Sequence, residues 1–495
     1  MRYLPAIRAA IPSELDWRHF LWFVLVLPRP IFGPGTVGYD FLLAGVFMLF
    51  VVMSIHRPKE LLLLFCMAFF SNAFGWFTHF QLTGGSGSRI LLLDVLLPGL
   101  FLLTAFYQVY YRKFNRFYLW TGILMISLLW GRNFLGGILS SQVGYVIGEA
   151  RFYFGVGLLF MVVNLMDGDP EREIRKYLHL ICLGSVVISV HVLLISVGLA
   201  LSVEHDLAAE AASRRFNPGS AQSIAIAFGL IIACADVVYK SNFHLLRRGK
   251  LILVVGYLLI LVLSGVRTMT VVSFLVLLYF FLISKDFGVL RKIVGTVAIV
   301  LLGAGALQLE SIQKVVATQT AYVDSYENKS TGSTADWRMG MWEIFWKKIS
   351  ASNSRLLWGR PFDFERINIV ALNWKPDGKI IPYADNSLAH NDFISMTMTN
   401  GLVFTVCFLV ILFLYLFRSY LDAQRFKAYR PLLMILFWFL LSQMIQSATN
   451  AEIKHYGQSI TLWLHMGMLA LMLRQVRRNT HSLSSESQLS NHVYA

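Results

Sequence analysis

Long apolar runs separated by short polar segments dominate the chain. A bilayer core of roughly 30 Å needs about 20 apolar residues of helix, and by this criterion we identify about fourteen candidate spans. They lie near residues 19–37, 39–55, 60–80, 90–111, 117–135, 150–166, 177–203, 221–239, 250–264, 268–284, 290–309, 388–417, 430–448 and 458–473. Pro28, Pro30 and Pro34 interrupt the first, and the short pair 250–264 and 268–284 is expected to form a tight hairpin. The pattern predicts an all-α polytopic membrane protein with about 12–14 transmembrane helices.

The polar segments divide the chain into four regions. We expect N-terminal transmembrane helices over 1–309, a large outer loop over 310–387, C-terminal transmembrane helices over 388–478 and a disordered tail over 479–495. Within the loop, the stretch WRMGMWEIFWKKIS carries apolar residues at helical spacing, namely Trp337, Met341, Ile344 and Phe345. The loop is therefore expected to be partly helical and to cap the outer face of the bundle.

Composition supports this class and excludes others. Of the 495 residues, 56% are hydrophobic and 14% are charged, whereas charged residues make up roughly 25% of soluble domains. Too few polar residues are present to cover the surfaces of a soluble enzyme, and a disordered chain or a secreted disulfide scaffold fits no better. The four cysteines lie in apolar runs, so neither a disulfide nor a metal site is implied.

The net charge of +15 is explained by topology. In a soluble protein such an excess would indicate nucleic acid, but cytoplasmic loops of membrane proteins collect Lys and Arg. Every second loop of this chain is basic, for example 57–59, 172–176, 240–250, 418–430 and 474–478. We therefore place these loops and both termini in the cytoplasm, and expect no nucleic-acid partner.

Arginines on the outer side are exceptions to this rule. Arg214 and Arg215 precede the span 221–239, Arg267 precedes 268–284, and Arg338 lies in the large loop. Both spans run inward, so their N-termini, which favour anions, face outward. Because a guanidinium holds phosphate oxygens in a planar fork, these residues predict a phosphate or diphosphate site at the outer face. The alternative for any one of them is an arginine that reaches lipid headgroups or pairs with a loop carboxylate.

His390 is the candidate general base. It lies at the outer start of the span 388–417, where a histidine of near-neutral pKa can accept a proton from a sugar hydroxyl. Asn391 and Asp392 are close enough to orient it or the acceptor, and Asn386 or Ser387 is expected to cap the helix. The alternative is a capping or interfacial histidine without a chemical role.

Several chemistries find no support in the sequence. There is no phosphate-binding glycine loop, no HExxH motif, and no cysteine–histidine spacing of a metal site, so we expect neither a cofactor nor a metal. Acids within apolar spans are few, namely Asp40, Asp94 and Asp236, and all lie near span ends. A proton-coupled carrier usually needs an acidic relay within the bilayer, and the scarcity of such acids counts against an antiporter.

Four segments between about residues 213 and 410 carry short motifs, and their order along the chain can be compared with that of known families. They are RRFNPGSAQSIAIAFGL, SGVRTMTVVSFLVLLYFF, WRMGMWEIFWKKISASNSRLLWGRPFDF and AHNDFISMTMTNGLV. Each precedes or begins a helix or lies in the large loop. Their order resembles that of the O-antigen ligase and polymerase superfamily of bacterial membrane glycosyltransferases. Departures are Gly219, where the family often has Asn, and Ile394, where Leu is usual.

The resemblance implies a substrate and a location. The donor would be a glycan on undecaprenyl diphosphate, presented at the periplasmic face of the bacterial inner membrane. Arg215 and Arg267 would hold the diphosphate and stabilise the leaving group, with Arg214 and Arg338 assisting in binding. No metal would be needed, because the lipid diphosphate is already an activated leaving group.

The resemblance implies residues that contact the acceptor but leaves the identity of the acceptor open. His390 would position or deprotonate the acceptor hydroxyl, and Asn391 and Asp392 would contact substrate. A polymerase would extend a lipid-linked repeat, whereas a ligase would transfer the chain to lipid A core; the length of the chain favours the polymerase slightly. A lipid-linked oligosaccharide transporter is the alternative from another class.

Overall fold

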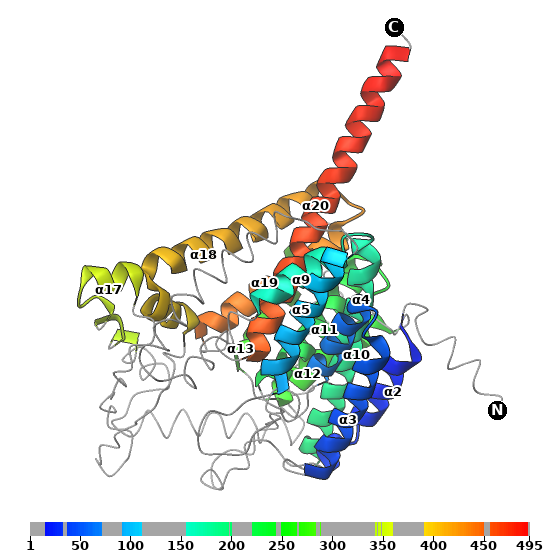
Figure 1. Cartoon of the computed structure of the whole chain (residues 1–495), viewed down its shortest axis with the longest axis vertical. Coiled ribbons are helices and arrows are strands. Elements are labelled where there is room, and N and C mark those ends of the chain that lie inside the picture. Colours follow the sequence, from blue (N-terminus) through cyan, green and yellow to red (C-terminus); the bar gives the residue numbers. More distant parts are fainter. Residues whose placement is uncertain are drawn as a thin grey trace, which may run out of the picture.

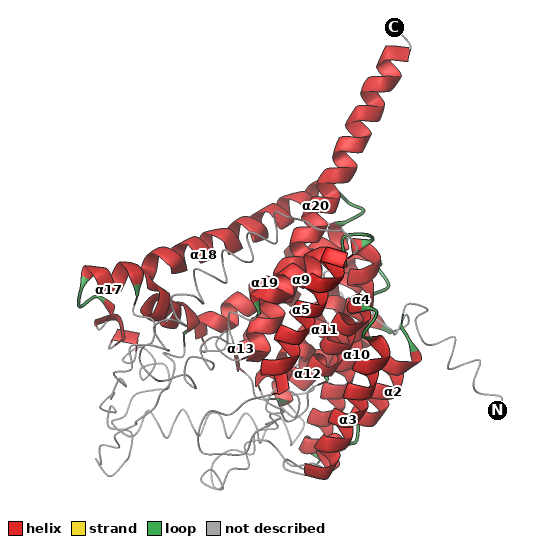
Figure 2. Cartoon of the chain, viewed as in Figure 1, coloured by secondary structure: helices red, strands yellow, loops and turns green. Residues whose placement is uncertain are grey.

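The computed structural model is helical throughout the part of the chain that it describes, and no strand occurs there (Figures 1 and 2). The structure describes residues 15–32, 37–71, 92–110, 155–197, 199, 220–243, 249–264, 267–283, 288, 342–343, 345–347, 349–359, 391–449 and 456–493. The predicted spans 117–135 and 290–309 and most of the loop 310–387 lie outside these residues. The predicted all-α class is confirmed for the described part.

The N-terminal helices follow the sequence pattern closely. Helix α2 (Trp17–Val26) is followed by a 3-10 helix η1 (Arg29–Phe32) and by α3 (Val37–Ser54). The prolines after α2 therefore end that helix, as expected from their missing N–H groups. Helices α4 (Pro58–Phe70) and α5 (Leu92–Tyr110) follow.

The central helices form the core of the bundle. They are α9 (Val156–Leu165), α10 (Pro170–Ser196), α11 (Ser220–Tyr239), α12 (Lys250–Leu263) and α13 (Arg267–Leu277), which continues as a π-helix η4 (Leu278–Ile283). Helices α12 and α13 pack on each other, as the predicted hairpin requires. Helix α11 packs against α10, α12, α13 and α19, so it occupies the centre of this group.

The C-terminal helices differ from the sequence prediction in two ways. They are α17 (Asn353–Trp358), α18 (Asp392–Arg425), α19 (Arg430–Thr449) and α20 (Tyr456–Val493). Helix α20 continues to Val493 where the sequence predicted a disordered tail, because no Gly or Pro after Arg478 interrupts the helix. The predicted span 388–417 is not one straight helix, because α18 is broken at Gly401.

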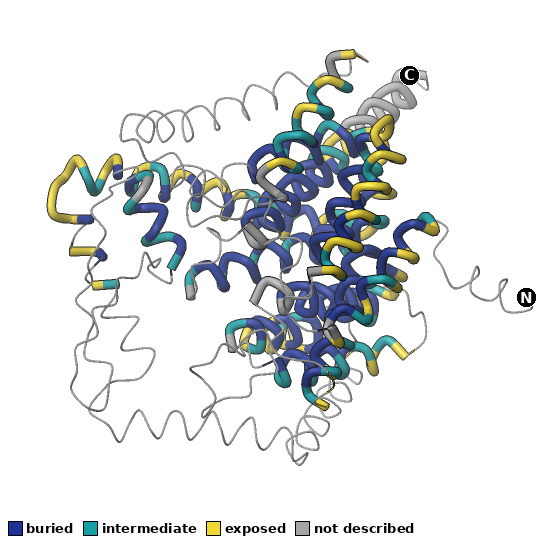
Figure 3. Tube along the Cα trace, turned by 60° about the horizontal axis from the view of Figure 1, so that its bottom comes forward, coloured by how far each residue is buried: buried dark blue, intermediate teal, exposed yellow. Residues whose placement is uncertain are grey.

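Three of the described helical stretches are long and apolar enough to cross a membrane, namely Pro170–Ser196, Asn400–Arg425 and Arg430–Ala448. Shorter apolar helices surround them. The first and third are mostly buried within the bundle, whereas only 28% of the Asn400–Arg425 stretch is buried. Exposed residues accordingly run along α18 in Figure 3. The structure therefore supports a membrane protein in which α18 presents apolar side chains outward.

Glycines allow the central helices to approach closely. A Cβ added to Gly184 of α10 would lie 2.7 Å from the carbonyl oxygen of Phe70, at the end of α4. A Cβ on Gly229 of α11 would lie 2.5 Å from Ser185 Oγ and 2.9 Å from Tyr257 Cζ. Small residues at such contacts are typical of helix packing in membranes. The hydrophobic effect does not drive helices together in lipid, so they associate through close van der Waals contact, which small residues allow.

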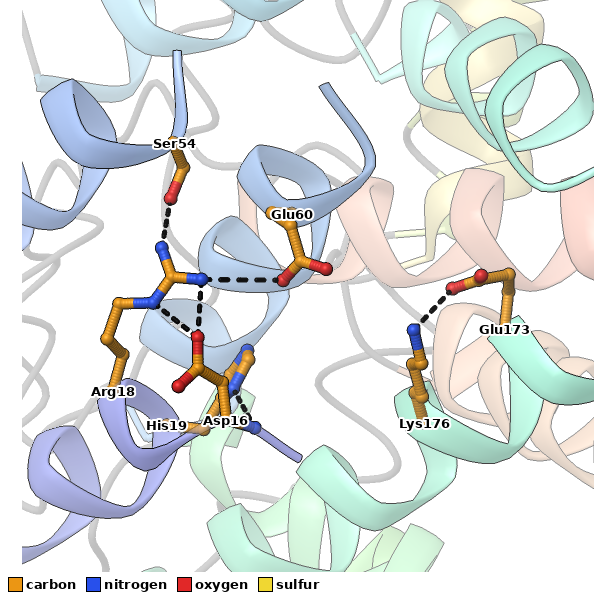
Figure 4. Close-up of polar contacts among 7 residues, drawn as sticks. All are labelled: Asp16, Arg18, His19, Ser54, Glu60, Glu173 and Lys176. Carbon is orange, nitrogen blue, oxygen red and sulfur yellow. Dashed lines mark hydrogen bonds and ion pairs between the residues drawn. The ribbon is translucent and has the colours of Figure 1, made fainter. Parts of the chain in front are cut away.

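Ion pairs gather several basic loops at one end of the bundle, which we call the basic end. Lys59 at the start of α4 lies 3.7 Å from Glu173 at the start of α10, and Lys176 lies 3.4 Å from the same carboxylate. Arg478 of α20 pairs with Asp167, which precedes α10, at 3.1 Å. Figure 4 shows the Lys176–Glu173 pair beside a second group of charges.

That second group centres on the buried Arg18, near the start of α2 (Figure 4). Its guanidinium donates to Asp16 at 2.7 Å and to Ser54 Oγ, at the end of α3, at 2.5 Å. It also lies 3.8 Å from Glu60, in the first turn of α4. One buried cation thus joins the ends of three helices and is neutralised by two carboxylates, as a buried charge requires.

The end of α11, the segment between α18 and α19, and α20 also lie at the basic end. The guanidinium of Arg175 lies 4.8 Å from the ring of Phe243, whose N–H donates to Asp236 at the end of α11. Asn479 of α20 donates to the hydroxyl of Tyr429, between α18 and α19. The charge pattern assigned these loops to one side of the membrane. Within the part of the chain that the structure describes, they meet at one end of the bundle.

Candidate functional site

The helix starts that follow the outer arginines lie away from the basic end. Because α11 ends there and α12 and α19 begin there, the starts of α11 and α13 and the end of α19 lie toward the opposite end. Helices α11 and α13 both pack on α19 and on each other. The N-terminus of α18 joins them, because Asn391 Nδ2 donates to Ala448 O near the end of α19 at 3.0 Å. Three helix N-termini, each with a partial positive charge, therefore belong to helices grouped around α19.

Of the site residues predicted from the sequence, some fall within the described part and some do not. Arg267 is the first residue of α13. Asn391 and Asp392 lie at the start of α18. The others, Arg214, Arg215, Arg338 and His390, lie outside the described residues.

Asn391 is the N-cap of α18. Its Oδ1 accepts from the N–H groups of Phe393 at 3.0 Å and Ile394 at 3.2 Å, while its Nδ2 makes the bond to Ala448. The prediction that Asn386 or Ser387 caps this helix was wrong, because the helix begins at Asp392. With both ends of its amide bonded to the backbone, Asn391 fixes the start of α18, and its contact with substrate stays a prediction.

A cluster of buried polar side chains lies beside this cap, which we call the outer polar cluster. It contains Asp392 and Ser395 of α18 and Gln446 and Ser447 of α19, all at most 1% exposed. Burying polar side chains in an apolar bundle costs free energy. Their presence where Asn391 joins α18 to α19 therefore makes this region a candidate functional site. Sequence reasoning identified Asp392 but missed the other three, although amides and hydroxyls inside an apolar span were the available signal.

The start of α18 is a short half-helix. Gly401 has φ 88° and ψ 164°, a conformation that favours glycine, and it breaks the helix. Thr397 Oγ1 donates to Thr405 Oγ1 at 3.2 Å, although residues eight apart on a straight helix are separated by about 12 Å along the axis. The chain therefore bends sharply at Gly401, and Asp392–Asn400 forms a separate element from the span that follows.

A buried hydrogen-bonded network lies within the bundle. Gln443 of α19 lies one turn before Gln446 on the same face, and it bonds to Thr461 and to His465 Nδ1 of α20. His465 Nε2 bonds to the hydroxyl of Tyr177 of α10 at 2.7 Å. The network joins three helices, and its histidine is fully buried. Sequence reasoning missed it, although a histidine in the middle of an apolar span was visible.

Two of the three acids within apolar runs are engaged locally. Asp40 accepts from Arg29 at 2.6 Å and 2.9 Å, and Asp236 accepts from Ser241 Oγ at 2.6 Å and from the N–H of Phe243 at 3.0 Å. These bonds secure chain turns near helix ends. Among the described residues, no group of three or more His, Cys, Asp or Glu side chains is arranged to hold a metal ion.

Helix N-termini favour an anion, whereas the side chains of the outer polar cluster are buried inside the bundle. No protein-family model matches the chain, and no curated protein matches it in sequence.

Proposed function

We propose that the protein is a membrane glycosyltransferase that moves a glycan from undecaprenyl diphosphate to a sugar hydroxyl at the periplasmic face. The observation that carries the proposal is that three of the four motif-bearing segments lead into α11, α13 and α18, whose N-termini lie away from the basic end. Basic loops favour the cytoplasm, so these N-termini face the periplasm in the proposal. Partial positive charges at that face suit a lipid diphosphate.

In the proposed reaction, the acceptor oxygen attacks the anomeric carbon while the bond from that carbon to the diphosphate oxygen breaks. The departing electron pair stays on the diphosphate, where Arg215, Arg267 and the helix N-termini stabilise it, with Arg214 and Arg338 assisting. His390 takes the proton of the acceptor hydroxyl. A single displacement inverts the anomeric carbon. Asn391 contributes by fixing the start of α18, directly after His390.

The test is reconstitution in proteoliposomes with a lipid-diphosphate-linked repeat unit and EDTA. A ladder of longer lipid-linked chains is expected and identifies a metal-independent polymerase. Product that forms only after lipid A core is added would instead identify a ligase. Movement of the lipid-linked sugar across the bilayer without any new glycosidic bond would refute the enzyme and favour the transporter.

Two variants test the residues. His390→Ala is expected to lower turnover by about a hundredfold or more, the usual contribution of a general base, whereas His56→Ala, at the exposed turn after α3, should not. Arg267→Lys is expected to lose about ten- to hundredfold, because one ammonium does not replace the guanidinium fork. Arg172→Lys, exposed at the basic end, is the matched control. Unchanged turnover in both test variants, with normal insertion, would end these assignments.

A further inference from the structure

Part of the large loop is fixed against the break in α18. A Cβ added to Gly401 would lie 2.6 Å from the carbonyl carbons of both Leu357 and Trp358, and it would also meet the Leu357 oxygen. The backbone at the end of α17 thus occupies the space that a side chain at position 401 would fill. Since the apolar stretch Asn400–Arg425 begins at this point, α17 lies at the level where that stretch starts.

The same segment exposes large apolar side chains. Trp346 is 46% exposed, Leu357 is 41% exposed and Trp358 is 56% exposed. Just beyond Gly401, the exposed side of α18 continues with Val403 and Val406. Further along α18 the exposed apolar residues are Val410, Ile411, Phe413, Leu414 and Phe417. The backbones of α17 and α18 meet at Gly401, so the exposed residues of the two helices adjoin there.

The segment also has a polar side. Glu343 and Lys347 form a 2.7 Å ion pair, and both side chains are mostly exposed. Phe345 and Ile349 are buried instead. At helical spacing Trp346 falls between these two sides. Trp346 is thus an outward-facing tryptophan next to a charged pair, and exposed tryptophan is typical of the boundary between membrane and water, where its ring lies in the headgroup layer.

We propose that the described residues 342–343, 345–347 and 349–359 form an interfacial anchor, which seats Trp346 and Trp358 in the lipid headgroups of the leaflet at which the Asn400–Arg425 stretch begins. The occupant of the exposed surface is the bilayer, because the surface continues the outward apolar side of a helix suited to cross it. Gly401 holds the anchor at this depth through its contact with α17. The inference does not depend on the proposed glycosyltransferase activity.

The chain supplies its own depth marker for the test. Cys407 is exposed on α18, whereas the other three cysteines, Cys66, Cys182 and Cys234, are buried. It lies six residues beyond Gly401, which is about 9 Å along a helix at 1.5 Å per residue. A fluorophore on Cys407 therefore reports a position deeper than the anchor. The same fluorophore is then placed on Trp358→Cys, Trp346→Cys or Lys347→Cys, each in a Cys407→Ser background.

The labelled full-length proteins are reconstituted in phosphatidylcholine and phosphatidylglycerol vesicles with spin-labelled lipids. At positions 346 and 358 we expect a greater loss of fluorescence to a headgroup spin label than to a mid-chain label, with the order reversed at Cys407. Lys347→Cys should lose fluorescence mainly to aqueous iodide. Quenching at both 346 and 358 by iodide and by neither lipid probe would overturn the proposal, and so would mid-chain quenching there equal to that at Cys407.

Discussion

Replacing Gly184 by alanine tests whether helix contact through glycine holds this bundle together. The new Cβ would lie 2.7 Å from Phe70 O and 2.8 Å from Phe70 Cβ, and backbone cannot move aside cheaply. Overpacking of this kind typically costs 1–3 kcal/mol, while alanine in place of glycine in a helix returns about 1 kcal/mol. Phe70 packs edge-on against Tyr177 and Phe228, so its displacement would spread to the centre of the bundle.

Gly256→Ala is the matched control, because nothing lies within 4 Å of a Cβ at that position on α12. We expect Gly184→Ala to be up to about 2 kcal/mol less stable than the native protein and Gly256→Ala to be equal or up to about 1 kcal/mol more stable. The measurement is the temperature at which the purified protein loses its monodisperse peak in size-exclusion chromatography. A Gly184→Ala protein as stable as Gly256→Ala would refute the close packing of α10 on α4.

Two further predictions concern hydrogen bonds that join helices. Tyr177→Phe removes the partner of the buried His465 Nε2 and is expected to destabilise by about 1 kcal/mol, within the range measured for such bonds in membranes. Tyr257→Phe should cost less, because Ser185 keeps its bond to Cys182 O; equal losses in thermal stability would contradict this. Asn391→Ala should cost about 0.5–2 kcal/mol through the lost N-cap, and Asn391→Asp should recover the cap without the bond to the end of α19. Thermal stability of Asn391→Asp no better than that of Asn391→Ala would show that the cap contributes nothing.

Helix positions were largely predictable because lipid imposes one strong requirement. Every backbone group in the apolar layer must be bonded within its own segment, so long apolar runs become helices whatever surrounds them. The boundaries of α3, α11 and α19 fall within two residues of the predicted spans for this reason. Charge alternation likewise identified loops that meet at the basic end, because charged side chains avoid the apolar layer.

Breaks and contacts between helices were less predictable. The sequence predicted an unbroken span over 388–417, and only the neighbouring backbone of α17 shows that a side chain would not fit at Gly401, where the helix is broken. The His465 network depends on three helices that are far apart in sequence, so no local pattern could pair Tyr177 with His465. The same holds for Arg18, whose partners come from the ends of α3 and α4.

The sequence alone thus determined the all-helical membrane class, most described helix positions and the set of loops that carry positive charge, since these follow from local composition and the apolar solvent. Only the tertiary structure decided which helix ends meet, that Asn391 ties α18 to α19, and that α18 is broken at Gly401. These depend on contacts between segments remote in the chain, namely Asn391 with Ala448 and Gly401 with the end of α17, which no local pattern encodes.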